Sequence, residues 1–140
     1  MVMDAPNFKD QLREFSQDYD GPRSRAVRHA ADVFEFYSLL SARARLNRQH
    51  QTIVNSVLAY FVVPEDLYPE ERLGPFGLVD DLYVAAHAFR LLRREVPYAD
   101  LHSCWKGDGD LEVVMEEVHR ECRAEIGKKA KDALRQAGLT

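Results

Sequence analysis

Carboxylates concentrate in one short stretch of the chain, where they could hold a divalent cation. Residues 64–81 contain one base, Arg72, and six acids: Glu65, Asp66, Glu70, Glu71, Asp80 and Asp81. Hard cations such as Mg²⁺, Mn²⁺ and Ca²⁺ prefer oxygen ligands. His87 follows Asp80 by seven residues, or two helical turns, and would extend such a site. The candidate binding set is Asp66, Glu70, Asp80, Asp81 and His87.

The same acids have a structural interpretation, which we favour over a metal site. Aspartate at a helix start accepts hydrogen bonds from unpaired backbone N–H groups and faces the positive end of the helix dipole. Asp66 lies between Pro64 and Pro69, where aspartate is ordinary turn chemistry. We therefore expect no cofactor, with a divalent cation as the alternative.

Two histidines and two cysteines form a weaker candidate for a zinc site. The set is His102, Cys104, His119 and Cys122, and an i, i+3 pair on a helix can ligate one Zn²⁺ ion. Cys122, however, falls on an apolar helical stripe, where a free cysteine behaves as a small hydrophobic residue. Zinc is accordingly the less favoured interpretation of these four residues.

Covalent catalysis finds little support in the sequence. Cys104 and the serines lack the glycine elbow or the cysteine signature that surrounds a catalytic nucleophile. The segment 74–77, Gly-Pro-Phe-Gly, lacks the lysine and the spacing of a phosphate-binding loop. We expect a protein that is not an enzyme.

Charge and aromatic residues point to binding. Residues 23–48 hold six arginines against Asp32 and Glu35, whereas residues 64–81 carry an excess of five negative charges. The arginines do not form one helical stripe, so nucleic-acid binding is not favoured. Intramolecular or partner-facing charge complementarity fits better. Tyr68 and Phe76, beside the acids, are candidate partner-facing apolar residues.

The elements that position these residues are all predicted to be helical. Apolar residues recur at helical spacing, and Pro and Gly punctuate the pattern. The helices are expected at about 7–19, 24–47, 51–62, 78–94, 98–105 and 111–137. The last is acidic in its first turns and basic in its last turns, matching the helix dipole. Residues 24–47 present an apolar surface wide enough for burial on two sides.

Bulk properties bound the class of protein. A chain of 140 residues with 46% hydrophobic and 30% charged residues is most simply one globular domain, residues 1–140. Two cysteines and a polar N-terminus favour the cytoplasm. The longest apolar run, 57–63, is far shorter than the ~20 residues that cross a bilayer. Membrane association is expected at most peripherally.

Residues 58–92 resemble the core of the YkvA-like family, bacterial helical proteins grouped as a domain of unknown function. The resemblance rests on Pro64-Glu65-Asp66-Leu67-Tyr68-Pro69-Glu70, then Gly74 to Gly77, then Asp80-Asp81-Leu82. Glu70 stands where the family pattern has aspartate, and Glu71 and Arg72 add charge to a link that is usually apolar. The resemblance implies a helical hairpin and no assigned chemistry.

The sequence thus predicts an all-α fold: a compact bundle of about five helices, built on a central antiparallel hairpin at about 51–94 and closed by a long C-terminal amphipathic helix. The function that we expect is non-catalytic. It is that of a protein–protein interaction module or accessory subunit of a bacterial assembly, with a protein partner or self-association. The alternative is a metal-binding protein or metal-dependent hydrolase that uses the acidic hairpin loop.

Overall fold

Every element of the computed structural model is helical within the residues that it describes, which are 8–43, 45–62 and 74–139. The all-α prediction is confirmed. The elements are α1 Phe8–Ser16, α2 Ser24–Val27, α3 Ala30–Arg43, α4 Arg48–Val62, η2 Gly74–Leu78, α6 Val79–Arg93, α7 Tyr98–His102, α8 Leu111–Ile126, η3 Gly127–Lys129 and α9 Ala130–Ala137. Within this part of the chain, no helix combines the length and the hydropathy that a membrane crossing requires.

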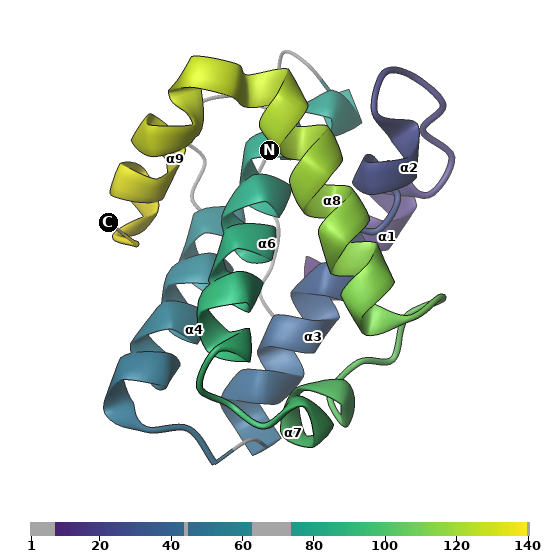
Figure 1. The fold of residues 1–140 in the computed structure, drawn as a ribbon. Coiled ribbons are helices and arrows are strands. Elements are labelled where there is room, and N and C mark those ends of the chain that lie inside the picture. Colours follow the sequence, from purple (N-terminus) through teal and green to yellow (C-terminus); the bar gives the residue numbers. More distant parts are fainter. Residues whose placement is uncertain (1–7, 44, 63–73, 140) are drawn as a thin grey trace.

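Helix α6 lies at the centre of the bundle (Figure 1). Eleven of its fifteen residues are buried. It packs most extensively against α8 and also contacts α4, α9, α3 and α2. A helix that is apolar around most of its circumference must be enclosed by other elements. The predicted hairpin is present: α4 and α6 pack together, with bounds within three residues of those expected.

The segment predicted as one helix at 24–47 is instead divided into α2 and α3 by a turn at Arg28 and His29. Neither residue is a glycine or proline, so the sequence holds no local signal for this break. Ion pairs join the start of this region to α8: Arg23 bonds Glu121 at 2.6 Å, and Arg25 contacts Glu117 at 3.3 Å. The break between α2 and α3 thus coincides with ion pairs between the α2 region and α8.

Both apolar sides of α3 are covered within the chain. Phe36 lies wholly inside the core against Phe89 and Trp105, while Phe34 contacts Phe8 of α1 and Phe61 of α4. The wide apolar surface of residues 24–47, for which the sequence predicts burial on two sides, is therefore buried by the protein's own helices. It provides no support for an external partner.

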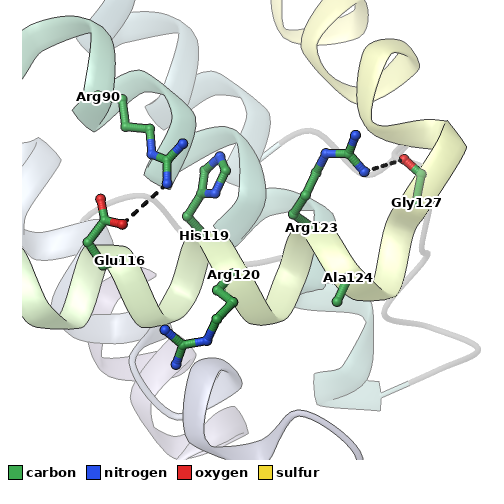
Figure 2. A pocket seen from close by; sticks show the side chains of 7 residues that line it. All are labelled: Arg90, Glu116, His119, Arg120, Arg123, Ala124 and Gly127. Carbon is green, nitrogen blue, oxygen red and sulfur yellow. Dashed lines mark hydrogen bonds and ion pairs between the residues drawn. The ribbon is translucent and has the colours of Figure 1, made fainter.

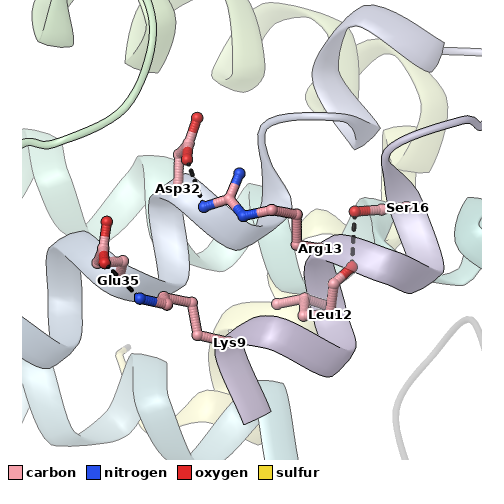
Figure 3. A network of polar contacts seen from close by, with 6 residues as sticks. All are labelled: Lys9, Leu12, Arg13, Ser16, Asp32 and Glu35. Carbon is pink, nitrogen blue, oxygen red and sulfur yellow. Dashed lines mark hydrogen bonds and ion pairs between the residues drawn. The ribbon is translucent and has the colours of Figure 1, made fainter. Parts of the chain in front are cut away.

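Helix α1 is held on α3 by charge as well as by packing (Figure 3). Lys9 pairs with Glu35 at 2.8 Å, and Arg13 pairs with Asp32 at 3.0 Å. The Ser16 hydroxyl donates to the carbonyl oxygen of Leu12, so the last turn of α1 satisfies its own buried hydroxyl. Both acids of the segment 23–48 are thus paired with α1, and not with the arginines of their own segment.

The long C-terminal helix predicted at 111–137 is broken at Gly127. Its start is as expected, since the Asp110 carboxylate accepts from the N–H of Val113 at 3.2 Å. Gly127 has φ 53° and ψ −120°, and this turn lets α9 fold back along α6 and α4. The chain therefore closes the bundle with two helices, α8 of sixteen residues and α9 of eight.

Replacing Gly127 by alanine should destabilise the protein by about 1–3 kcal/mol, because only glycine adopts this backbone conformation without strain. A Cβ there would meet no atom of the described residues within 4 Å, so the loss reports the backbone alone. Urea unfolding measures it. Gly138→Ala is the matched control: its φ of 79° and ψ of 25° are αL, and its cost should be smaller. Equal stability of Gly127→Ala and the wild type would contradict the assignment.

Candidate functional site

The acidic set predicted from the sequence is only partly within the described residues. Asp66, Glu70 and the apolar candidate Tyr68 lie outside them. Asp80 and Asp81 are in the first turn of α6, and both side chains are 0% exposed. Phe76, in η2, is half-buried and packs against the core. These described members face the interior of the bundle.

Asp80 connects the two helices of the hairpin. The Tyr60 hydroxyl on α4 donates to the Asp80 Oδ2 atom at 3.0 Å, within the core. The residue at the N-cap of α6 is Leu78, which makes no side-chain cap, so neither aspartate occupies the cap position. Their negative charge still lies beside the positive end of the α6 dipole, which stabilises them there.

His87 lies apart from the buried acids and beside His119. The rings of His87 and His119 both contact Tyr83, with centroid separations of 6.2 and 5.4 Å. Burial lowers the pKa of His87, and the charges of Arg90 and Arg94 lower it further. The structure therefore joins one residue of the predicted acidic set to one of the predicted zinc set.

The four residues of the zinc alternative are not brought together. No three His, Cys, Asp or Glu side chains among the described residues are placed to hold a metal ion. His102 is exposed on α7, while Cys122 is buried in the core face of α8, where burial raises the pKa of its thiol. Cys104 lines a separate pocket of about 250 Å³ with Arg43, Arg45, Asp100 and Ser103.

A larger open pocket lies along α8, beside the last turn of α6 (Figure 2). We call it the α6–α8 pocket; its volume is about 530 Å³ and its lining is Arg90, Glu116, His119, Arg120, Arg123, Ala124 and Gly127. Arg90, His119 and Arg123 project on the same side of α8, and Arg120 extends from it elsewhere. Only Arg90 comes from α6.

The lining of the α6–α8 pocket is mainly cationic. Three arginines and one glutamate line it: Arg90 contacts Glu116 at 3.3 Å, Arg123 lies on the same side of α8, and Arg120 extends from the other side of the helix (Figure 2). Arg123 donates to the carbonyl oxygen of Gly127 at 3.0 Å and so neutralises the end of α8. Arg120 makes no hydrogen bond or ion pair with the residues described. Such a group of planar donors is suited to binding carboxylate or phosphate oxygens.

His119 is the titratable group of this pocket. Burial is the main cause that lowers its pKa, to about 4, and Arg90, His87 and Arg123 lower it further, while Glu116 opposes them. At neutral pH its ring is therefore uncharged and offers one N–H donor. The pocket then holds a formal charge of +2, from three arginines and one glutamate.

These arginines were not predicted from the sequence, where the basic cluster is the segment 23–48, because Arg90 lies far along the chain from Arg120 and Arg123. In the segment 23–48, Arg23 and Arg25 contact glutamates of α8. The available signal was the spacing of Glu116, Arg120 and Arg123, which puts them on neighbouring rows of one helix. Arg90 joins them only through the packing of α6 on α8.

Comparisons with known proteins find similarity over the hairpin region and over most of the chain, and they assign no activity. Residues 52–86 match the family described as "Protein of unknown function (DUF1232)", the family that includes YkvA-like proteins. "Uncharacterized protein ORF9" of Methanothermobacter thermautotrophicus is 24% identical over 132 residues, covering 94% of this chain and 88% of that relative. No solved structure is significantly similar to the chain.

Replacing Tyr60 by phenylalanine should destabilise the protein by about 1–3 kcal/mol, since a buried carboxylate oxygen loses its donor. Thermal and urea unfolding measure this change. Tyr19→Phe is the matched control, because the Tyr19 hydroxyl donates to the Pro22 carbonyl oxygen at an exposed position; its effect should stay within about 0.5 kcal/mol. Similar losses in the two variants would contradict a special role for the Tyr60–Asp80 bond.

Stability should fall as the pH decreases from about 6.5 toward 4, in part because of His119. The unfolded chain takes up a proton at His119 near pH 6.5, whereas the folded chain does so only near pH 4. The unfolded state therefore binds more protons in this window. His119→Gln should lose less stability between pH 7 and 5 than the wild type does. An NMR titration of the His119 ring with a midpoint near 6.5 would overturn this prediction.

Proposed function

We propose that this protein is a non-catalytic binding module whose α6–α8 pocket recognises an acidic segment of a partner protein. The observation that carries the proposal is that the lining of one open cavity includes Arg90, Arg120 and Arg123 and a single carboxylate, that of Glu116. The excess positive charge attracts carboxylates, and guanidinium groups bind them through paired hydrogen bonds.

The chemistry of the lining favours holding a ligand over transforming it. Its side chains include no hydroxyl or thiol nucleophile, and its one carboxylate, Glu116, is engaged by Arg90. Binding and release of an anion need only the donors that are present.

Charge, not apolar area, is the expected source of affinity. Among the described residues, Val62 and Val113 are the exposed large hydrophobic side chains, at 48% and 66% exposure. Scattered single residues of this kind do not form an apolar docking patch. Recognition through surface arginines gives fast association and an affinity that falls as salt rises.

A metal-dependent function of the acidic hairpin has weaker support. Asp80 and Asp81 have no solvent-exposed surface, and Asp80 already accepts a hydrogen bond from Tyr60. A cation at these two aspartates would have to enter the core of the bundle and lose most of its water ligands. The exposed arginines of the α6–α8 pocket face no such barrier.

Arg120→Gln should weaken binding of a fluorescein-labelled peptide of alternating glutamate and serine by about fivefold, or ~1 kcal/mol, at low ionic strength. Fluorescence anisotropy measures the affinity. Arg120 is exposed and makes no contact that its loss would disturb, so the fold should be unchanged. The matched control is Arg48→Gln, at the exposed start of α4 and outside the pocket lining, which removes the same charge.

Two results would contradict the proposed function. One is equal weakening by Arg120→Gln and Arg48→Gln, which would indicate attraction to net charge alone. The other is the absence of binding to the wild type at 1 mM peptide (about −4 kcal/mol) in low salt.

A further inference from the structure

We propose that a second pocket, between the end of α3 and α7, binds an acidic α-amino acid such as L-glutamate. We call it the α3–α7 pocket; its volume is about 250 Å³ and its lining is Arg43, Arg45, Asp100, Ser103 and Cys104. The end of α3 and the helix α7 lie at the same end of the bundle (Figure 1). The α3–α7 pocket shares no lining residue with the α6–α8 pocket, so this site is independent of the proposed function.

Opposite charges line the α3–α7 pocket without meeting. Arg43 ends α3 and Arg45 follows it in the connection to α4, whereas Asp100 belongs to α7. Among the described residues, these three side chains form no ion pair or hydrogen bond with one another or with any other group. A ligand that carries both a carboxylate and an ammonium group would neutralise the two walls of the pocket together.

The wall that carries the arginines is anchored to two helices. The Asn47 Oδ1 atom accepts from the backbone N–H of His50 at 2.7 Å, in the first turn of α4. The Gln51 side chain donates to the Ser41 hydroxyl oxygen at 3.1 Å and so joins α4 to α3. The connection that contains Arg45 is therefore held at both of its ends.

The wall formed by α7 is also fixed. The Arg93 guanidinium of α6 lies over the Tyr98 ring at 4.5 Å, at the start of α7. After α7, the Trp105 ring contacts Phe36 of α3 with a centroid separation of 6.1 Å. Because both walls are held by contacts outside the cavity, a ligand has little ordering of the backbone to bring about when it binds.

Each part of an acidic α-amino acid has a partner in the lining. Guanidinium groups bind carboxylates through paired, charge-assisted hydrogen bonds, which suits Arg43 and Arg45. An ammonium group has three N–H donors, and the Asp100 carboxylate accepts them. The Ser103 hydroxyl donates to the Asp100 backbone carbonyl oxygen at 2.8 Å, so its own oxygen can accept from the same ammonium. Cys104, 2% exposed, offers a weakly polar surface for the ligand's methylene groups.

The charge and the size of the α3–α7 pocket favour an acidic amino acid over a neutral one. Two arginines and one aspartate give the lining a formal charge of +1. At pH 7 an acidic α-amino acid carries two carboxylates and one ammonium group, a charge of −1. The volume of about 250 Å³ is below the roughly 300–1,000 Å³ of pockets for drug-sized ligands, which suits a single amino acid.

The test compares L-glutamate with two ligands that each lack one charged group. L-Glutamine lacks the second carboxylate, and glutarate lacks the ammonium group. We expect L-glutamate to bind the wild-type protein with a Kd below about 1 mM in low salt, and at least about fivefold more tightly than either of the others. Isothermal titration calorimetry at pH 7 gives the three affinities.

Two variants assign the charged groups of the ligand to the two walls. Arg45→Gln should weaken L-glutamate and glutarate alike, by about fivefold, because both ligands lose a guanidinium. Asp100→Asn should weaken L-glutamate by a similar factor and should not weaken glutarate, which has no ammonium group to lose a partner. The matched control is Arg48→Gln, which removes the same charge at an exposed position outside the pocket lining and should change neither affinity by more than about twofold. All three side chains are exposed, so the fold should be unchanged.

Several results would overturn the assignment. One is the absence of L-glutamate binding to the wild type at 10 mM, roughly ten times the expected Kd. Another is equal binding of glutarate and L-glutamate, which would leave the ammonium group without a role. Equal weakening by Arg45→Gln and Arg48→Gln would indicate attraction to net charge alone. None of these results bears on the peptide affinity that tests the α6–α8 pocket.

An NMR titration locates the bound amino acid. Addition of L-glutamate should shift the backbone amide signals of Ser103 and Cys104, which line the α3–α7 pocket. The amides of Ala124 and Gly127, in the lining of the α6–α8 pocket, are the internal control and should not shift. Shifts confined to the α6–α8 pocket would overturn the placement of the ligand between α3 and α7.

Discussion

The burial of α6 is the constraint on which the rest of the bundle depends. Its first two turns are buried without interruption, from Val79 to Ala86, so other helices must enclose it. Small residues at 85, 86 and 88 let those helices approach closely. The Tyr37 hydroxyl reaches the Ala85 carbonyl oxygen inside this packing, at 2.5 Å. The arrangement of α3, α4, α8 and α9 follows from covering one central element.

The same constraint separates the two kinds of charge in the hairpin. At the start of α6, enclosure places Asp80 and Asp81 in the core, where a hydrogen bond from Tyr60 ties α4 to α6. At its end the apolar pattern gives way to arginines, which remain at the surface. Helix α8 crosses α6 and contributes further arginines beside Arg90. The acids thus have an internal, structural position, while an open cationic pocket forms at the surface.

The polar residues of α8 form two rows that make different contacts. Glu117, Glu121 and Glu125 recur every four residues, and the arginines and histidine of the α2 region contact them. The row of Glu116, Arg120 and Arg123 lies beside this one and lines the pocket. One row therefore stabilises the fold by internal charge pairing. The other row makes fewer contacts within the chain, and this difference supports our proposal that the pocket binds an acidic partner.

The sequence by itself determined the helical class, the hairpin and the start of the amphipathic last segment, because these depend on periodicity and on residues near in the chain. Tertiary structure decided what distant residues do together. Residues 24–47 form two helices although no glycine or proline lies at the break between them, and the chain turns at Gly127. In the folded chain His87 lies beside His119, and not with the other residues of the predicted acidic set. The physical reason is that helical spacing fixes which residues share a face, whereas only packing fixes which faces meet.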